Sequence, residues 1–67
     1  MSKPMKPKYK TGDIVVNIYH ELYFFIYGSN DTEYYYYVLK AVANLYYKEN
    51  TKNSSSISYV DVCFNKI

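Results

Sequence analysis

Residues 22–27 read Leu-Tyr-Phe-Phe-Ile-Tyr, residues 28–32 read Gly-Ser-Asn-Asp-Thr, and residues 33–39 read Glu-Tyr-Tyr-Tyr-Tyr-Val-Leu. Aromatic and β-branched residues at this density are typical of β-strands, because their side chains pack well on a pleated, half-buried surface. The small and polar residues between the two runs supply the chemistry of a turn. The stretch therefore predicts a β-hairpin, and we expect the rest of the chain to be organised around it.

Alternation along the hairpin assigns its side chains to two faces. In the first arm, the side chains that we expect in the core are Leu22, Phe24 and Ile26. In the second arm, Lys40 sets the parity, because its charged side chain belongs on the outside. That choice predicts the following core residues: Tyr35, Tyr37, Leu39 and Ala41. It places Tyr34, Tyr36 and Val38 on the outer face.

The outward side chains of both arms would then form an aromatic patch. Exposed tyrosines are enriched in protein interfaces, and a patch of this size exceeds the scattered apolar exposure usual for monomers. The candidate partner-binding residues are Tyr23, Phe25, Tyr27, Tyr34 and Tyr36. The sequence leaves a second interpretation open, in which another segment or a second copy of the chain covers the patch. Abundant Tyr, Asn, Lys and Ile also fit the codon usage of an AT-rich genome, such as that of a low-GC bacterium or its phage.

The segment before the hairpin predicts one more strand. A Gly12-Asp13 turn pair precedes the run Ile-Val-Val-Asn-Ile-Tyr at residues 14–19. We expect Ile14, Val16 and Ile18 to face the core.

The segments after the hairpin predict a polar connection, a strand and a turn. Residues 48–56 are entirely polar and indicate a mobile loop or hairpin tip. Residues 57–62 alternate as a strand, with Val60 and Val62 toward the core. Residues 63–67 indicate a short helical turn that packs Phe64 and Ile67 against one end of the core.

A helical interpretation of residues 33–47 competes with the second arm of the hairpin. Thr32 can cap a helix, and apolar residues recur at helical spacing: Tyr35, Val38, Leu39, Val42, Leu45 and Tyr46. Consecutive tyrosines nevertheless favour a strand. We therefore predict an all-β fold, a small antiparallel barrel of about five strands with a short C-terminal turn, and keep a ββαβ domain of the α+β class as the alternative.

The charge distribution separates a basic arm from the rest of the chain. Residues 1–8 contain two prolines among lysines and predict a flexible arm, whereas residues 9–67 form one small β domain. Four lysines and no acid lie in residues 1–10, while four lysines face six acids in residues 11–67. The lysines that could contact nucleic-acid phosphates are Lys3, Lys6, Lys8 and Lys10. A near-neutral body lacks the basic face usual for a nucleic-acid reader.

The sequence carries no pattern typical of catalysis, metal binding or membrane insertion. A single histidine, His20, and a single cysteine, Cys63, allow neither a zinc cluster nor an internal disulfide, and no glycine-rich phosphate loop is present. We expect His20 to lie in an exposed turn and Cys63 to be a small buried hydrophobic residue or an incidental thiol. No leader or membrane-spanning stretch is evident. These features predict a cytoplasmic, non-enzymatic protein without a cofactor.

Two parts of the chain resemble small SH3-like barrels, the class that includes KOW and Tudor-like domains and many uncharacterised phage proteins. They are Tyr-Lys-Thr-Gly-Asp-Ile-Val-Val at residues 9–16 and Val-Asp-Val-Cys-Phe-Asn-Lys-Ile at residues 60–67, which flank the hairpins. The resemblance implies a module that binds proteins or nucleic acids and rarely catalyses. The basic loops of a nucleic-acid-binding KOW domain are not evident here.

These observations favour a phage or mobile-element protein that binds and modulates or inhibits a host protein of the defence or nucleic-acid-processing machinery. A nucleic-acid-binding accessory protein, which would use the lysine arm and the tyrosines, is the second hypothesis. A self-associating structural protein is the third.

Overall fold

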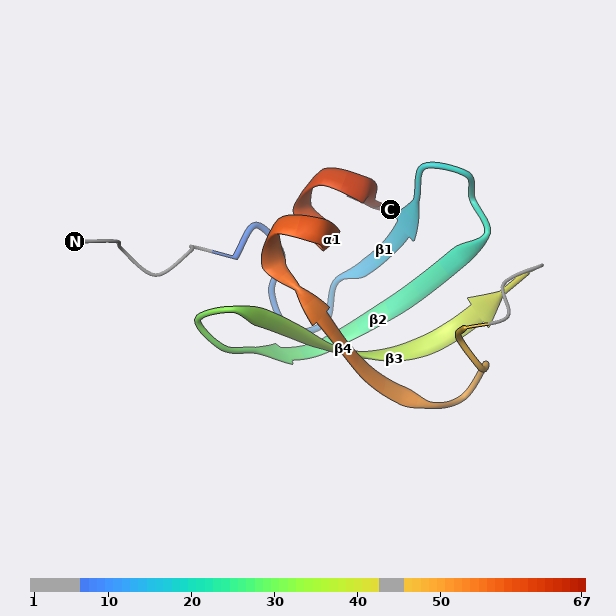
Figure 1. Ribbon diagram of the computed structural model, residues 1–67, viewed down its shortest axis with the longest axis horizontal. Helices are drawn as coiled ribbons and strands as arrows, with labels where there is room; N and C mark the ends of the chain where they lie inside the picture. Colours follow the sequence, from blue (N-terminus) through green and yellow to red (C-terminus); the bar gives the residue numbers. More distant parts are fainter. Residues whose placement is uncertain (1–6, 43–45) are drawn as a thin grey trace.

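The computed structural model describes residues 7–42 and 46–67. Its strands are β1 (Ile14–Asn17), β2 (Leu22–Ser29), β3 (Glu33–Ala41), β4 (Lys52–Ser56) and β5 (Phe64–Lys66), and helix α1 (Ile57–Cys63) connects the last two strands. All five strands belong to one antiparallel sheet, in which α1 and β1 lie above the long β2–β3 hairpin (Figure 1). The predicted all-β, barrel-like fold of five strands is therefore confirmed.

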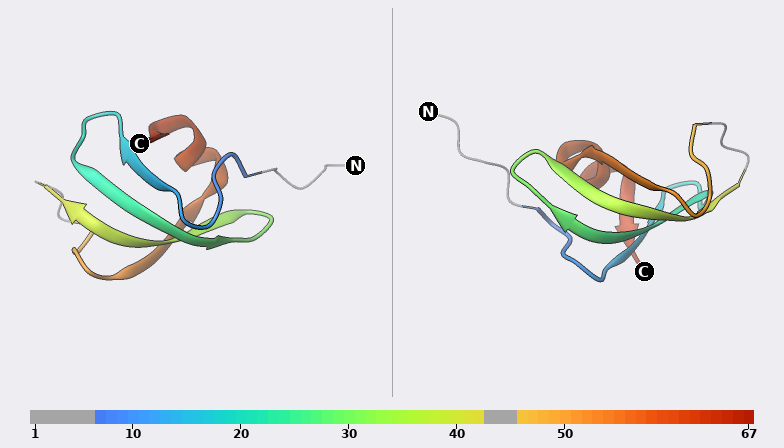
Figure 2. Two further views of the ribbon diagram at one scale, coloured as in Figure 1. Left: turned by 180° about the vertical axis from the view of Figure 1, so that it is seen from behind. Right: turned by 90° about the horizontal axis from the view of Figure 1, so that it is seen from below.

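The sheet curls because its two edge strands are joined by the helix. The strand order is β4-β3-β2-β1-β5, so β4 and β5 lie at opposite edges although α1 alone separates them in sequence. The helix contacts both edge strands and also β3. Figure 2 shows the resulting arrangement from behind and from below, with α1 over the concave side of the sheet. The core lies between that concave side and α1.

The central hairpin forms as the sequence predicts. Asn30 begins the turn, and its side-chain oxygen accepts hydrogen bonds from the backbone N–H groups of Thr32 at 2.8 Å and Glu33 at 2.7 Å. An asparagine side chain that bonds the backbone two residues onward stabilises a tight turn. The alternative helix over residues 33–47 is wrong for residues 33–41, which form β3. Residues 43–45 of that interval lie outside the described residues.

The predicted parity of β3 is wrong, because a β-bulge separates Lys40 from the rest of the strand. Tyr23 lies opposite Lys40, but Phe24 lies opposite Val38, so Leu39 is an extra residue without a partner. A bulge interrupts the two-residue alternation of a strand. The outward orientation of Lys40 therefore does not determine which side chains of residues 34–38 face the core.

The side chains before the bulge point the other way from the prediction. Tyr34, Tyr36 and Val38 are fully buried, whereas Leu39 is 40% exposed. Tyr35 and Tyr37 are only partly buried. Beyond the bulge, Ala41 packs against the core as predicted. A second irregularity, at Tyr27 in β2, lies between the pairs Ile26–Tyr36 and Gly28–Tyr35.

Strand β1 is shorter than predicted, and of its three expected core residues only Val16 is buried. Val15 lies opposite Phe24, and both side chains are fully buried. Ile14 and Ile18, which were expected in the core, are 37% and 54% exposed. The strand ends at Asn17, whose side-chain oxygen accepts the backbone N–H groups of Glu21 and Leu22, and this turn carries Ile18 out of the sheet.

The polar segment after residue 48 is partly a strand, not only a loop. Residues 52–56 form the edge strand β4, which pairs residue by residue with β3 from Glu33–Ser56 to Tyr37–Lys52. The hydrophobic pattern could not indicate this strand, because backbone pairing with β3 holds it in place. The side chain of Asn53 also accepts the backbone N–H of Ser54 at 2.9 Å, so one polar group of this edge is occupied within the strand.

In the C-terminal segment, the order of the strand and the helical turn is the reverse of the prediction. Residues 57–63 form α1, and residues 64–66 form strand β5. Ser56 caps the helix, whose buried residues Ile57 and Val60 lie at helical spacing, and Phe64 is buried at the start of β5. Val62 and Ile67 were expected in the core, but they are 78% and 70% exposed. Residues two apart in a helix point to opposite sides, so Val62 is exposed because Val60 is buried.

The core is an aromatic stack enclosed by aliphatic side chains. The rings of Phe24 and Tyr36 are stacked with centroids 3.8 Å apart, and Phe24 also contacts Phe64 at 4.8 Å. Leu22 and Ile26 are buried as predicted, as are Val60 and Phe64. The buried cluster consists of Tyr9, Val15, Leu22, Phe24, Ile26, Tyr34, Tyr36, Val38, Ile57, Val60 and Phe64.

Candidate interaction surface

The convex side of the sheet carries an aromatic surface, although not the one predicted. Tyr23, Phe25 and Tyr27 of β2 point outward, as expected from the burial of their neighbours. The outward orientation predicted for Tyr34 and Tyr36 is wrong, since both side chains are in the core. Their places on the convex side are taken by the neighbouring residues Tyr35 and Tyr37. We call the resulting set the outer aromatic face: Tyr23, Phe25, Tyr27, Tyr35 and Tyr37.

Cross-strand pairing brings these rings together. Phe25 lies directly opposite Tyr37, and the rings of Tyr27 and Tyr35 are stacked with centroids 6.2 Å apart. Asn30 donates a hydrogen bond from Nδ2 to the Tyr35 hydroxyl at 2.5 Å, which fixes this ring at the hairpin end of the face. The arrangement is a continuous patch across β2 and β3.

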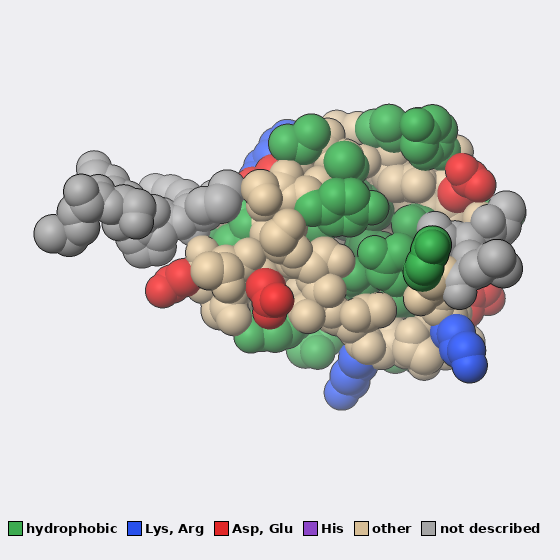
Figure 3. Space-filling view, in the orientation of Figure 1, with side chains coloured by type: hydrophobic (Ala, Val, Ile, Leu, Met, Phe, Trp, Pro, Cys, Tyr) green, Lys and Arg blue, Asp and Glu red, His purple; other side chains and the backbone are tan. Residues whose placement is uncertain are grey.

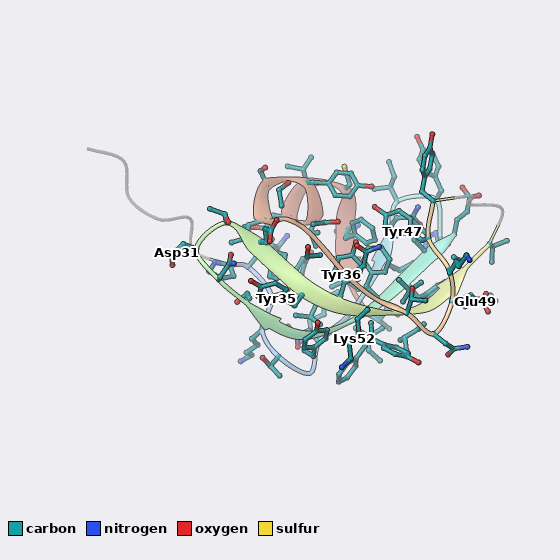
Figure 4. The ribbon with its side chains drawn as sticks, turned by 60° about the horizontal axis from the view of Figure 1, so that its bottom comes forward. Asp31, Tyr35, Tyr36, Tyr47, Glu49 and Lys52 are labelled. Atoms are coloured by element: carbon teal, nitrogen blue, oxygen red, sulfur yellow. The ribbon has the colours of Figure 1, made fainter. Side chains whose placement is uncertain are left out.

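The outer aromatic face is only partly covered by the protein itself. Its members are partly exposed, and Tyr27 reaches 41% exposure, whereas Phe24 and Tyr36 on the concave side have none. Helix α1 and Tyr47 pack on the concave side. In Figure 4, Tyr36 and Tyr47 lie above the sheet, while Lys52 projects below it. Within residues 7–42 and 46–67, no helix or strand packs over the convex side.

Two lysines belong to this face. Lys52 of β4 lies opposite Tyr37, and its Nζ is 5.7 Å from the centroid of the Tyr27 ring on β2. Because β3 separates β4 from β2, the side chain of Lys52 extends across the middle of the face. Lys40 lies opposite Tyr23 at the other end of β3. The ion pair found among the described residues joins Lys66 to Asp13 at 3.4 Å, so neither Lys40 nor Lys52 has a carboxylate partner there.

The concave side holds a network of buried hydroxyl groups. The Tyr34 hydroxyl donates to Asp61 Oδ1 at 2.7 Å and accepts the backbone N–H of Tyr9 at 2.9 Å. The Tyr9 hydroxyl donates to the carbonyl oxygen of Phe64 at 2.7 Å. Burial, together with the Asp61 carboxylate, raises the pKa of Tyr34 to about 12. These groups are mutually satisfied, and their role is to join β3, α1, β5 and the segment before β1.

A hydrogen bond between two hydroxyl groups joins β3 to β4. The hydroxyls of Tyr36 and Ser55 lie 2.7 Å apart, and burial raises the pKa of Tyr36. Burial also raises the pKa of Tyr59 on α1, with a further contribution from Tyr47. Raised pKa values keep these phenols protonated, which makes them structural hydrogen-bonding groups rather than bases.

A separate apolar surface surrounds the helix. Ile18 and Tyr19 in the β1–β2 connection are 54% and 71% exposed, and Val62 on α1 is 78% exposed. The backbone N–H of Ile18 donates to the carbonyl oxygen of Cys63, so the connection and the helix are neighbours. Figure 3 shows hydrophobic side chains gathered over the upper part of this face and lysines at its lower edge. This helix surface lacks the cross-strand ring packing of the outer aromatic face.

The residues considered for catalysis are dispersed. His20 is exposed in the β1–β2 turn with a positive φ of 58°, and Cys63 is half-buried at the end of α1. Among residues 7–42 and 46–67, no group of three or more His, Cys, Asp or Glu side chains is placed to hold a metal ion, and the surface shows no pocket. The described part of the chain also contains no helix long and apolar enough to cross a membrane.

The two described lysines of the N-terminal arm, Lys8 and Lys10, contact Tyr9 and Asp13. Tyr9 is anchored in the core, and the Nζ of Lys8 is 5.5 Å from the centroid of its ring. Lys10 is exposed, and its backbone N–H donates to the Asp13 carboxylate. Lys3 and Lys6 lie outside the described residues.

The tyrosines and lysine that complete the face could not be found from the sequence pattern. The alternation of residues 33–41 predicts Tyr35 and Tyr37 in the core, because nothing in their composition reveals the bulge at Leu39. Lys52 was assigned to a loop because its strand is polar throughout. Comparison with known proteins brings no match at the level of a family model, a curated protein or a solved structure.

Proposed function

We propose that this chain is a non-enzymatic interaction module that binds a partner protein through the outer aromatic face. The observation that carries the proposal is the set of five half-buried to exposed rings on the side of the sheet opposite to α1. Protein interfaces are enriched in tyrosine and phenylalanine at their centre and polar at their rim. Here Asn30 at the hairpin end and Lys40 at the other end of β3 are polar neighbours of the rings, which matches that anatomy.

The composition supports a phage or mobile-element origin, with a host protein as the partner. Modulation or inhibition of a defence or nucleic-acid-processing protein fits a chain of 67 residues that acts by covering a surface. The resemblance to small SH3-like barrels supports the same class of function.

Substitutions on the two faces of the molecule test the proposal. Phe25→Ser and Tyr27→Ser remove rings from the outer aromatic face, whereas Ile18→Ser and Val62→Ser remove comparable apolar groups from the helix surface. We expect the first pair to abolish capture of a host protein by the immobilised chain and the second pair to retain it. Circular dichroism melting curves identify variants that fail to fold. Equal capture by all four folded variants would contradict the proposal.

Nucleic-acid binding is a second candidate, favoured by the Lys52 ammonium group beside the stacked rings of Tyr27 and Tyr35. Single-strand binders combine aromatic stacking with a positive groove. The described residues, however, contain six lysines and six acids, so the charge is balanced. Titration of labelled single-stranded and double-stranded DNA and RNA at low salt separates the two functions. Self-association is tested by light scattering, since a monomeric mass at high concentration would exclude it.

A further inference from the structure

The outer aromatic face has a positive charge near its centre rather than only at its rim. Lys52 starts on the edge strand β4, and its ammonium group reaches the Tyr27 ring on β2. Neighbouring strands are about 4.8 Å apart, so the lysine stem spans the width of β3. Its methylene groups can cover aromatic carbon while the charged end stays in water.

Tyr37 of β3 has a lysine as a neighbour both across the sheet and along its own strand. Across the sheet, its neighbours are Phe25 on β2 and Lys52 on β4. Along β3, the next residues pointing outward are Tyr35 before it and Lys40 beyond the bulge. Lys52 across the sheet and Lys40 along β3 are therefore the charged neighbours of Tyr37 in the sheet, and neither has a carboxylate partner in the described part of the chain.

The acidic residues near the sheet lie at its ends. In Figure 4, Asp31 is at the hairpin tip and Glu49 is at the opposite end, with Tyr35 and Lys52 between them. The Glu49 carboxylate accepts the backbone N–H of Ala41 at 3.3 Å. The middle of the face thus combines apolar area with uncompensated positive charge.

We infer that the partner is an acidic protein segment, whose carboxylates meet Lys40 and Lys52 while its apolar side chains pack on the ring of Tyr37. This inference rests on the proposed function and names the chemistry of the partner. Carboxylates of the segment gain charge-assisted hydrogen bonds to the two ammonium groups, and the one that meets Lys52 can draw it away from Tyr27 to expose that ring. The complementary charge also rejects basic partners.

A protein segment fits this face better than a nucleic acid. Each lysine neutralises about one phosphate, and this electrostatic attraction supplies essentially all of the affinity of non-specific nucleic-acid binding. The face offers two lysines, and Glu33 at the start of β3 adds a negative charge beside the hairpin end. One acidic segment can satisfy both ammonium groups, whereas a nucleic-acid strand would extend beyond them toward Asp31 and Glu33.

Selection from a library of random-sequence peptides tests the inference on the full chain. We expect the wild-type protein to enrich peptides in which Asp or Glu adjoins an apolar residue. The Lys40→Gln, Lys52→Gln double variant should bind those peptides about tenfold more weakly. The Lys8→Gln, Lys10→Gln double variant removes the same charge elsewhere and should bind them as the wild type does. Tyr37→Ser reports whether the peptides use the outer aromatic face at all.

The selection distinguishes failure of the inference from failure of the proposed function. Neutral or basic peptides that depend on Tyr37 would overturn the inference while the proposed function stands. Acidic peptides that both lysine double variants bind equally would overturn it in the same way. A library that yields no peptide dependent on Tyr37 would overturn both proposals. Displacement of the selected peptides by an oligothymidylate would identify the anionic partner as a nucleic acid and would also overturn the inference.

Discussion

The hydroxyl of Tyr34 donates a hydrogen bond of 2.7 Å to the carboxylate of Asp61, and this contact joins β3 to α1 across 27 residues of sequence. The same hydroxyl accepts the backbone N–H of Tyr9 at 2.9 Å. One buried phenol therefore holds the helix, the sheet and the segment before β1 together.

Tyr34→Phe should destabilise the protein at neutral pH by about 1–3 kcal/mol, because the substitution removes the hydrogen bond to Asp61 and leaves the Tyr9 N–H buried without a partner. Urea unfolding measures the change in free energy. Tyr23→Phe is the matched control, since it removes a phenol hydroxyl from a partly exposed ring of the outer aromatic face. A loss as large in the control would show that the buried network is not the cause.

The stability advantage of the wild type over Tyr34→Phe should shrink at alkaline pH. The pKa of Tyr34 is raised from 10.0 to about 12, mainly by burial, so the folded state favours the neutral phenol. The contribution is fully present below pH 10, the unfolded value, and is lost as the pH rises through the folded value. Urea unfolding of both proteins at neutral pH and between these two values measures the gap. A gap that stays constant would show that Tyr34 titrates alike in both states.

The central hairpin could be predicted from sequence because its signal is local. The aromatic density of residues 22–27 and 33–39 and the turn chemistry at Asn30 act within a few residues, and the burial of Leu22, Phe24 and Ile26 follows from alternation. The parity of β3 could not be predicted in this way. It depends on the bulge at Leu39, which is set by how β2 pairs with β3 and leaves no trace in a run of tyrosines.

The C-terminal half shows the same division between local and tertiary causes. Strand β4 exists because β3 supplies its backbone partners, although its own residues are polar. The helix had a local signal, since Ser56 is a favourable cap and Ile57, Val60 and Phe64 follow helical spacing, but the alternation of residues 57–62 suits a strand equally well. Three residues of the candidate surface could not be predicted from sequence for the same reason. The outward positions of Tyr35, Tyr37 and Lys52 all depend on how β3 pairs with its neighbours.

Substitution with lysine at two adjacent positions tests the assignment of the bulge. Val38→Lys places a charge in the core opposite Phe24 and should cost about 3–5 kcal/mol, because the ammonium group has no buried partner. Leu39→Lys places the same charge on the exposed bulge residue and should change the stability by no more than about 0.5 kcal/mol. Thermal melting compares the two variants. The reverse order of stability would restore the parity expected from Lys40 alone.

The two glycines should respond differently to alanine. Gly12 has a positive φ of 98°, and a Cβ there would meet no atom within 4 Å, so the cost of Gly12→Ala is backbone strain of about 1–3 kcal/mol. Gly28 has no such constraint, and its Cβ would make an ordinary contact with the Tyr35 ring at 3.7 Å. Gly28→Ala should therefore be neutral or slightly stabilising. Chemical denaturation distinguishes them, and equal losses would contradict the assignment of strain to Gly12.

Ser56 is the residue at which the polar strand becomes a helix. Its extended backbone ends β4, and its hydroxyl accepts the backbone N–H of Tyr59 at 3.3 Å, which satisfies one of the free N–H groups of the first helical turn. Ser56→Ala should destabilise the protein by about 1 kcal/mol, while Ser56→Asp should retain most of the stability because Asp also caps helices.

The matched control for the cap is Ser54→Ala, which changes an exposed serine of the same strand that makes no cap. Urea unfolding of the three variants gives the free energies. Amide hydrogen exchange adds a local measurement, because loss of the cap should increase the exchange rate at Tyr59 more than at residues in the centre of β3. A similar loss of stability in the Ser54 and Ser56 alanine variants would mean that β4 pairing, rather than the cap, determines where α1 begins.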